Sequence, residues 1–148
     1  MYKRILLAYD GSESGQQALI NCRDIAQWSH SQLFLIAVMP PTPTYLAVEG
    51  GYYEGGNDVQ VELERQKYQD ILADGLKQLS DAGHIASGEV LVGDTVEQIA
   101  GYARQVSADL IVVGHRHLDS WAARWWRGSS ARALIERAPC SVLVVITH

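Results

Sequence analysis

The sequence has few cysteines and no long apolar run. Two of its 148 residues are cysteine, too few for a disulfide framework, so we expect reduced thiols and a cytoplasmic protein. Cys22 and Cys140 are both expected to be buried structural thiols. No apolar run approaches the roughly 18 residues of a membrane helix, so we expect no membrane insertion. The opening residues lead directly into an apolar segment, without the pattern of a signal peptide.

Basic residues are outnumbered by acidic ones. The chain has 12 Lys and Arg against 17 Asp and Glu, which gives a net charge of −5. A protein that binds nucleic acid needs a basic surface, so this balance argues against nucleic acid as a partner. A hydrophobic fraction of 47% and a charged fraction of 20% predict a globular chain with a substantial core. Because no internal repeat and no second domain are evident, we expect one domain over residues 1–148.

The usual catalytic signatures are missing as well. No Ser-His-Asp order, Walker-type lysine or pair of carboxylates is evident. The order Gly114-His115-Arg116-His117 does not match a His-x-Gly-His signature. His115 and His117, with Asp119, make a sparse ligand set for zinc, so we expect no metal site built from protein ligands alone. Whether the chain is an enzyme stays open, and slow hydrolysis as a by-product of ligand binding is the most that we expect.

Short apolar runs alternate with segments of helical periodicity. Five runs rich in Ile, Val and Leu predict strands at Ile5–Tyr9, Leu33–Met39, Val90–Val92, Leu110–Val113 and Val142–Ile146. Apolar stripes predict helices at Ser14–His30, Asp58–Ala82, Thr95–Ser107 and Ser129–Arg137. This alternation predicts an α/β fold with a parallel sheet and right-handed crossovers. The Pro- and Gly-rich residues 40–57 predict a mobile loop over the carboxyl edge of the sheet.

Helix ends are marked by capping residues. Gly83 is expected to end the second helix. The expected N-caps of the first, third and fourth helices are Ser12 or Ser14, Asp94 or Thr95, and Ser129 or Ser130.

Two strand ends carry residues suited to ligand binding. In an open α/β sheet, ligands bind outside the carboxyl ends of strands, where the strand order reverses. Asp10 follows the first strand, and its carboxylate is a strong acceptor for ribose hydroxyls or an adenine amino group. A plain turn or helix-cap role is equally compatible with Asp10. Gly128-Ser129-Ser130 opens the last helix, where free N–H groups attract phosphate, although simple capping is the alternative there.

Three long stretches carry recognisable motifs: "KRILLAYDGSESGQQAL", "DTVEQIAGYARQVSADLIVVGHR" and "GSSARALIERAPCSVLVV". Taken in this order they resemble the universal stress protein family, and the resemblance covers essentially the whole chain. The resemblance implies a Rossmann-like open five-stranded parallel sheet of order 3-2-1-4-5, with helices on both faces. The family is usually dimeric, and one of its branches binds ATP while another does not.

The nucleotide motif of the binding branch is present at both ends and altered in the middle. That motif is Gly-x-x-Gly, nine residues, then Gly-Ser or Gly-Thr. Here Gly114 supplies the first glycine, His117 replaces the second, and ten residues precede Gly128-Ser129. Glycine lets a backbone approach phosphate closely, whereas a histidine ring fills that space. Added arginines, whose planar fork suits phosphate, are the expected compensation.

Carried over by position, the resemblance implies a set of nucleotide-contacting residues. Ala8, Val38 and Val113 would border adenine, and Asp10 would face the ribose or adenine. Gly114, His117, Gly128, Ser129 and Ser130 would lie along the phosphates. Arg116 and Arg127 are not part of the family motif and are the added arginines that we expect to contact the phosphates. The expected ligand is ATP, ADP or AMP, with Mg²⁺ held through the phosphates.

The last predicted strand, Val142–Ile146, indicates a homodimer. In the family order this long apolar strand lies at a sheet edge, where pairing with a second copy would cover it. The tryptophans Trp121, Trp125 and Trp126 suit a lid on the nucleotide site or a protein contact. The alternative function is therefore a dimeric interaction module of the same fold that binds no nucleotide.

Overall fold

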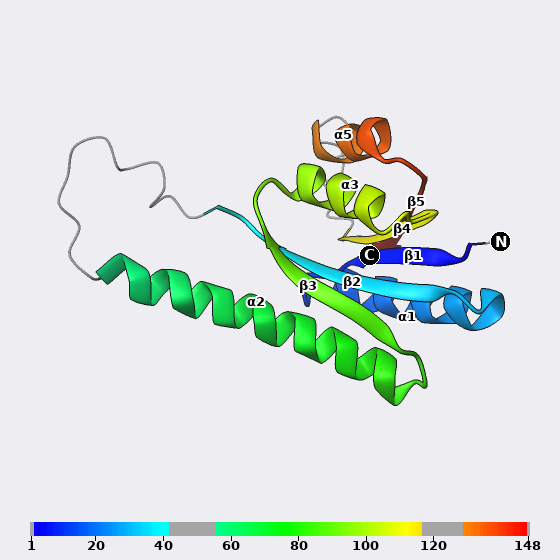
Figure 1. The fold of residues 1–148 in the computed structure, drawn as a ribbon, viewed down its shortest axis with the longest axis horizontal. Helices are drawn as coiled ribbons and strands as arrows, with labels where there is room; N and C mark the ends of the chain where they lie inside the picture. The colour runs from blue at the N-terminus through cyan, green and yellow to red at the C-terminus, as the bar shows by residue number, and fades with distance from the viewer. Residues whose placement is uncertain (1, 42–55, 117–128, 148) are drawn as a thin grey trace.

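The five strands form one parallel sheet with helices on both faces (Figure 1). The computed structural model describes residues 2–41, 56–116 and 129–147. Its elements, in chain order, are β1 (Arg4–Ala8), α1 (Glu13–Ser29), β2 (Gln32–Met39), α2 (Gly56–Asp81), β3 (Ala86–Val92), α3 (Thr95–Gln105), β4 (Leu110–Arg116), α5 (Ser129–Arg137) and β5 (Ser141–Thr147). The strand order is β3-β2-β1-β4-β5, which confirms the predicted fold class.

Two hydrophobic layers explain why the strands have continuous apolar runs. Alternate side chains of a strand point to opposite faces of its sheet. Ile5 and Leu7 of β1 accordingly belong to the core covered by α1 and α2, whereas Leu6 belongs to the core covered by α3 and α5. β1 lies at the centre, where Leu6 pairs in register with Phe34 of β2 and Ile111 of β4. Both faces of the central strands are therefore buried.

The capping side chains settle the alternatives for α1 and α3. Ser12 caps α1, because its Oγ accepts from the Gly15 amide at 3.1 Å. Asp94 caps α3, because its Oδ1 accepts from the Glu97 amide at 3.0 Å. The alternative Ser14 is wrong, since it lies inside the first turn of α1. Thr95, the other alternative, is the first residue of α3.

Three expectations about α2 and its neighbours need correction. Leu63 belongs to the apolar stripe from which the sequence predicts this helix, and it was therefore expected to face the sheet. It is instead 65% exposed, because the first half of α2 extends past the sheet (Figure 1). Gly56 and Asn57 belong to α2 rather than to the preceding loop. β3 begins at Ala86, not at Val90. The sequence did not predict its first half because that half lacks the large apolar residues by which strands are recognised. A Cβ on Gly88 would lie 2.5 Å from the Leu35 carbonyl oxygen, so glycine permits close pairing with β2.

The two cysteines differ in environment. Cys22 is 1% exposed in the core under α1, which confirms the buried thiol. Cys140 is only half-buried, because it precedes the edge strand β5, so the prediction was wrong there. Among the described residues, no helix is long and apolar enough to span a membrane.

Candidate functional site

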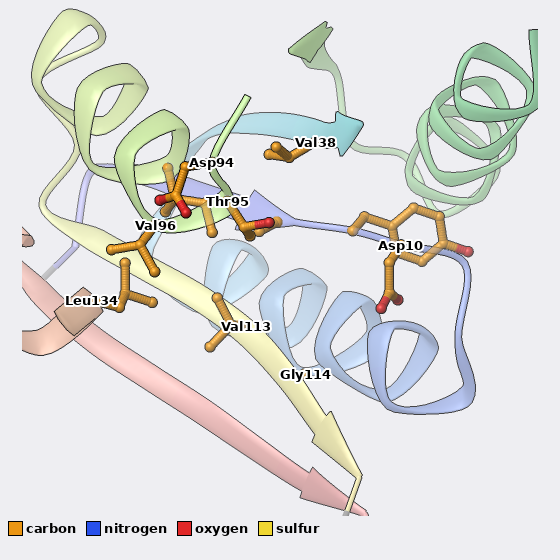
Figure 2. A pocket seen from close by; sticks show the side chains of 11 residues that line it. Asp10, Val38, Asp94, Thr95, Val96, Val113, Gly114 and Leu134 are labelled. Atoms are coloured by element: carbon orange, nitrogen blue, oxygen red, sulfur yellow. The ribbon is translucent and has the colours of Figure 1, made fainter. Parts of the chain in front are cut away.

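A cavity of about 390 Å³ lies outside the carboxyl ends of the central strands (Figure 2). The strand order reverses between β1 and β4, and the crevice at such a reversal is where ligands bind in open α/β sheets. The lining residues are Ala8, Tyr9, Asp10, Val38, Asp94, Thr95, Val96, Ile99, Val113, Gly114 and Leu134. They come from three strand ends and from the helices α3 and α5.

Most of the wall is apolar. Val38 of β2 and Val113 of β4 lie on either side of Ala8 on β1, whose methyl group leaves the centre open. Val96 of α3 and Leu134 of α5 complete the wall beyond them (Figure 2). A mostly apolar cavity with a few polar groups at its rim is the usual form of a small-molecule site.

Asp10 combines a local structural role with a place at the rim. Its Oδ1 accepts from the Ser12 amide at 2.9 Å and from Ser12 Oγ at 2.5 Å. Because Ser12 Oγ gives its proton to Asp10, Ser14 Oγ is the donor in the 3.0 Å contact between the two serines. Asp10 Oδ2 has no hydrogen-bond partner within the described part of the chain. The turn role and the ligand role left open by the sequence can therefore coexist on different oxygens.

Tyr9 ties the end of β1 to α2. Its hydroxyl donates to Asp74 Oδ2 at 3.1 Å, and Gln78 Nε2 donates to the same oxygen at 2.8 Å. Burial, followed by the hydrogen bond and charge of Asp74, raises the pKa of Tyr9 to about 12. The phenol is therefore neutral at physiological pH.

Gly114 has a packing role that its place in the nucleotide motif did not predict. A Cβ there would lie 2.1 Å from the Ser14 carbonyl oxygen and 2.7 Å from the Gly15 amide nitrogen. Backbone atoms at the start of α1 cannot give way as a flexible side chain can. Glycine is thus needed for β4 to pass the N-terminus of α1.

The structure brings together five of the predicted site residues. Ala8, Asp10, Val38, Val113 and Gly114 all line the cavity, although their contact with a nucleotide stays a prediction.

The other predicted phosphate contacts divide into two groups. Arg116 ends β4, and Ser129 and Ser130 begin α5. The structure describes the backbone of these three residues but not their side chains. His117, Arg127 and Gly128, like Asp119 and the three tryptophans of that segment, lie outside the described residues.

Six lining residues were not predicted to belong to the site. They are Tyr9, Asp94, Thr95, Val96, Ile99 and Leu134. Asp94 and Thr95 were interpreted only as helix caps, and Tyr9 only as the end of a strand. The apolar residues of α3 and α5 were interpreted only as helix faces that pack on the sheet. A usable signal did exist for Asp94, because the end of the third strand reaches the same edge of the parallel sheet as the ends of the first and fourth.

Polar contacts hold α5 against α3 beside the cavity. Arg137 of α5 forms an ion pair with Glu97 of α3. Arg104 of α3 donates to the Arg137 carbonyl oxygen at 2.8 Å. These contacts help keep Leu134 and Val96 on the same cavity wall.

The fold and the position of the cavity are those of Rossmann-like α/β proteins. The model of the universal stress protein family matches residues 1–145, so the chain belongs to that family. A universal stress protein from Thermus aquaticus, described as in the QAH/OAS sulfhydrylase 3'region, is 31% identical over 146 residues. The match covers 98% of this chain and 99% of that relative.

Solved structures show the same architecture. The hypothetical protein MJ0577 is 24% identical with a TM-score of 0.77, over 100% of this chain and 98% of that chain. UspA from Lactobacillus plantarum is 25% identical with a TM-score of 0.72, over 97% of both chains.

Three further similar structures contain an adenine nucleotide. A universal stress protein in complex with cAMP is 23% identical, with a TM-score of 0.66 over 97% of this chain and 96% of its own. One from Archaeoglobus fulgidus in complex with dAMP is 19% identical, with a TM-score of 0.65 over 97% and 98%. One from Arabidopsis thaliana with AMP bound is 16% identical, with a TM-score of 0.71 over 99% and 92%. At these identities the likeness concerns the fold.

Proposed function

We propose that this chain is a cytoplasmic stress-response regulatory protein that binds an adenine nucleotide, ATP, ADP or AMP, in the cavity beside β1 and β4. The observation that carries the proposal is an apolar cavity at the strand reversal, with a carboxylate oxygen of Asp10 left free at its rim. The nucleotides bound to three proteins of the same fold support it. An apolar slot suits a purine, and a free carboxylate oxygen suits ribose hydroxyls.

The charges of the lining favour the nucleoside, rather than the phosphates, as the occupant of this cavity. The described lining residues include two carboxylates, Asp10 and Asp94, and no Lys or Arg. Phosphate would be repelled there, so in our proposal it extends toward the start of α5. Ser129 begins that helix, and helix N-termini favour anions. Arg116 and Arg127 are the proposed positive charges, and Mg²⁺ is held through the phosphates.

The regulatory part of the proposal rests on the contacts between the cavity rim and α2. A Cβ on Gly11 would lie 3.5 Å from Ile71 of α2, and Tyr9 is bonded to Asp74 of the same helix. A ligand that holds Asp10 in place would therefore also bias the position of α2. The N-terminus of α2 directly follows the segment predicted as a loop, and in our proposal occupancy of the cavity changes that segment or the dimer.

We further propose a homodimer through residues 142–146 of β5. β5 is an edge strand, and Ile146 is 40% exposed. An apolar edge is protected when a second copy covers it. Light scattering at micromolar concentration should report a dimer, and Ile146→Lys should yield monomers. A wild-type monomer under these conditions would contradict this part of the proposal.

Nucleotide analysis after acid extraction, followed by calorimetric titration with ATP, ADP and AMP, tests the proposed ligand. Ala8→Leu should abolish binding by filling the slot, and Asp10→Asn should weaken it. The matched controls are Ala82→Leu and Asp24→Asn, which change exposed residues away from the cavity. No extracted nucleotide and no heat at millimolar ligand would instead favour the interaction module without a nucleotide.

A further inference from the structure

Asp94 is a second carboxylate at the cavity, placed across from Asp10. Asp94 follows β3 and Asp10 follows β1, with β2 between the two strands. Two strand spacings amount to about 10 Å, comparable to the length of a nucleoside. In Figure 2 the two aspartates lie on opposite sides of the cavity, with Val38 and Val113 between them. A nucleoside whose ribose meets Asp10 would therefore extend its base toward Asp94.

The helix cap fixes the way in which Asp94 can meet a ligand. Its Oδ1 accepts from the Glu97 amide at 3.0 Å and closes the first turn of α3. Its second oxygen has no hydrogen-bond partner among the residues that the structure describes. A carboxylate accepts hydrogen bonds and cannot donate them. This side of the cavity therefore complements a ligand group that carries a donor.

We propose that Asp94 is the specificity-determining residue for the base, and that its free oxygen accepts from the 6-amino group of adenine. This inference rests on the proposed nucleotide function. It goes further by assigning recognition of the amino group to a residue of the β3–α3 turn. Guanine presents two neighbouring donors, which match the paired oxygens of an uncommitted carboxylate. With one oxygen committed to Glu97, Asp94 matches the amino group of adenine better.

Two nucleosides that differ only in the proposed contact test it. Purine riboside is adenosine without the 6-amino group. Calorimetry on the wild-type protein should show adenosine binding about tenfold more tightly than purine riboside, as expected for a hydrogen bond to a charged group. Asp94→Ser should reduce that ratio to about one, because serine preserves the N-cap but lacks the second oxygen. A thermal melt of this variant verifies that it is folded.

Asp94→Asn should change the preference between two ligands, which a loss of protein stability alone would not do. Its carbonyl oxygen keeps the bond to Glu97, so the amide NH₂ takes the place of the free oxygen. A donor there opposes the adenine amino group and suits the 6-oxo group of inosine. The ratio of inosine to adenosine affinity should therefore rise about tenfold or more.

The possible outcomes distinguish the proposed role of Asp94 from the proposed nucleotide binding. If the wild-type protein binds adenosine and neither Asp94 variant changes the ratios, the role of Asp94 is overturned while nucleotide binding stands. If the wild-type protein binds none of the three nucleosides and no adenine nucleotide, both proposals fail. Asp10→Asn is the control, since it should weaken adenosine and purine riboside equally and leave their ratio unchanged.

Discussion

Gly114 lies against the backbone of Ser14, with room for a hydrogen atom but not for a methyl group. The Ser14 carbonyl oxygen would be 2.1 Å from a Cβ at position 114. This contact joins the end of β4 to the start of α1 at the rim of the cavity. The glycine that opens the altered nucleotide motif therefore supports the shape of the site as well as any ligand.

Gly114→Ala should destabilise the protein by about 1–3 kcal/mol, the usual cost of overpacking, and should weaken nucleotide binding by moving the Asp10 loop. Gly101→Ala is the matched control, because nothing lies within 4 Å of its Cβ position in α3. Alanine there should be neutral or should stabilise by up to about 1 kcal/mol through helix propensity. Urea denaturation measures both variants, and equal stability of the two would refute the packing role.

Tyr9→Phe should lower the free energy of unfolding by about 1 kcal/mol at neutral pH, because it removes the hydrogen bond to Asp74. The difference should shrink at high pH. The pKa of Tyr9 is raised from 10.0 to about 12, so the unfolded chain loses this proton first. The stabilisation is complete below pH 10 and is lost as the pH rises toward about 12. Denaturation of both proteins across this range checks the sign, and a pH-independent difference would contradict it.

Asp109→Ala should destabilise the chain by about 1–3 kcal/mol without affecting the nucleotide affinity of the folded protein. Asp109 accepts from the Lys3 amide at 2.8 Å and from the Arg4 amide at 3.0 Å. It thereby joins the start of β1 to the start of β4, at the sheet edge opposite the cavity. Denaturation and calorimetry measure the two effects, with the exposed Asp24→Ala as a control expected to stay within about 0.5 kcal/mol of wild type. A parallel loss of affinity would show that the two edges are coupled.

A thiol reagent should modify Cys140 in the native protein and Cys22 only after unfolding. Burial raises the pKa of Cys22 to about 12, so that thiol is both shielded and protonated. Burial, and to a lesser extent the charge of Asp109, also raises the pKa of the half-buried Cys140, so its reaction should be slow at neutral pH. With an aromatic disulfide as the reagent, the absorbance of the released aromatic thiol gives the reaction rates of the native and of the unfolded protein. In the Cys140→Ser variant the native-state reaction should disappear, and rapid labelling that persisted there would overturn the assignment.

Local patterns in the sequence were sufficient to predict the strands and helices and about half of the residues that line the cavity. Continuous apolar runs such as that of β1 predicted strands buried on both faces, and helical stripes predicted the covering helices. Asp10 was located because it directly follows a strand at a reversal of strand order. Leu63 was misplaced because periodicity describes one side of a helix and does not indicate where the sheet beneath it ends.

By itself, the sequence determined the α/β class, because that class follows from the periodicity and order of its apolar residues. Its motifs resemble those of the family, and the resemblance implied the strand order that places the ends of β1 and β4 side by side. Only the tertiary structure placed Asp94 across from Asp10, bonded Tyr9 to Asp74 and packed Gly114 against Ser14. The members of each pair lie far apart in the sequence, and even the nearest two, Tyr9 and Asp74, are 65 residues apart. Asp94 lies across from Asp10 because parallel strands align their carboxyl ends at one edge, whereas Asp74 and Ser14 are brought to their partners by helices that pack on the sheet. No local pattern in the sequence contains these relationships.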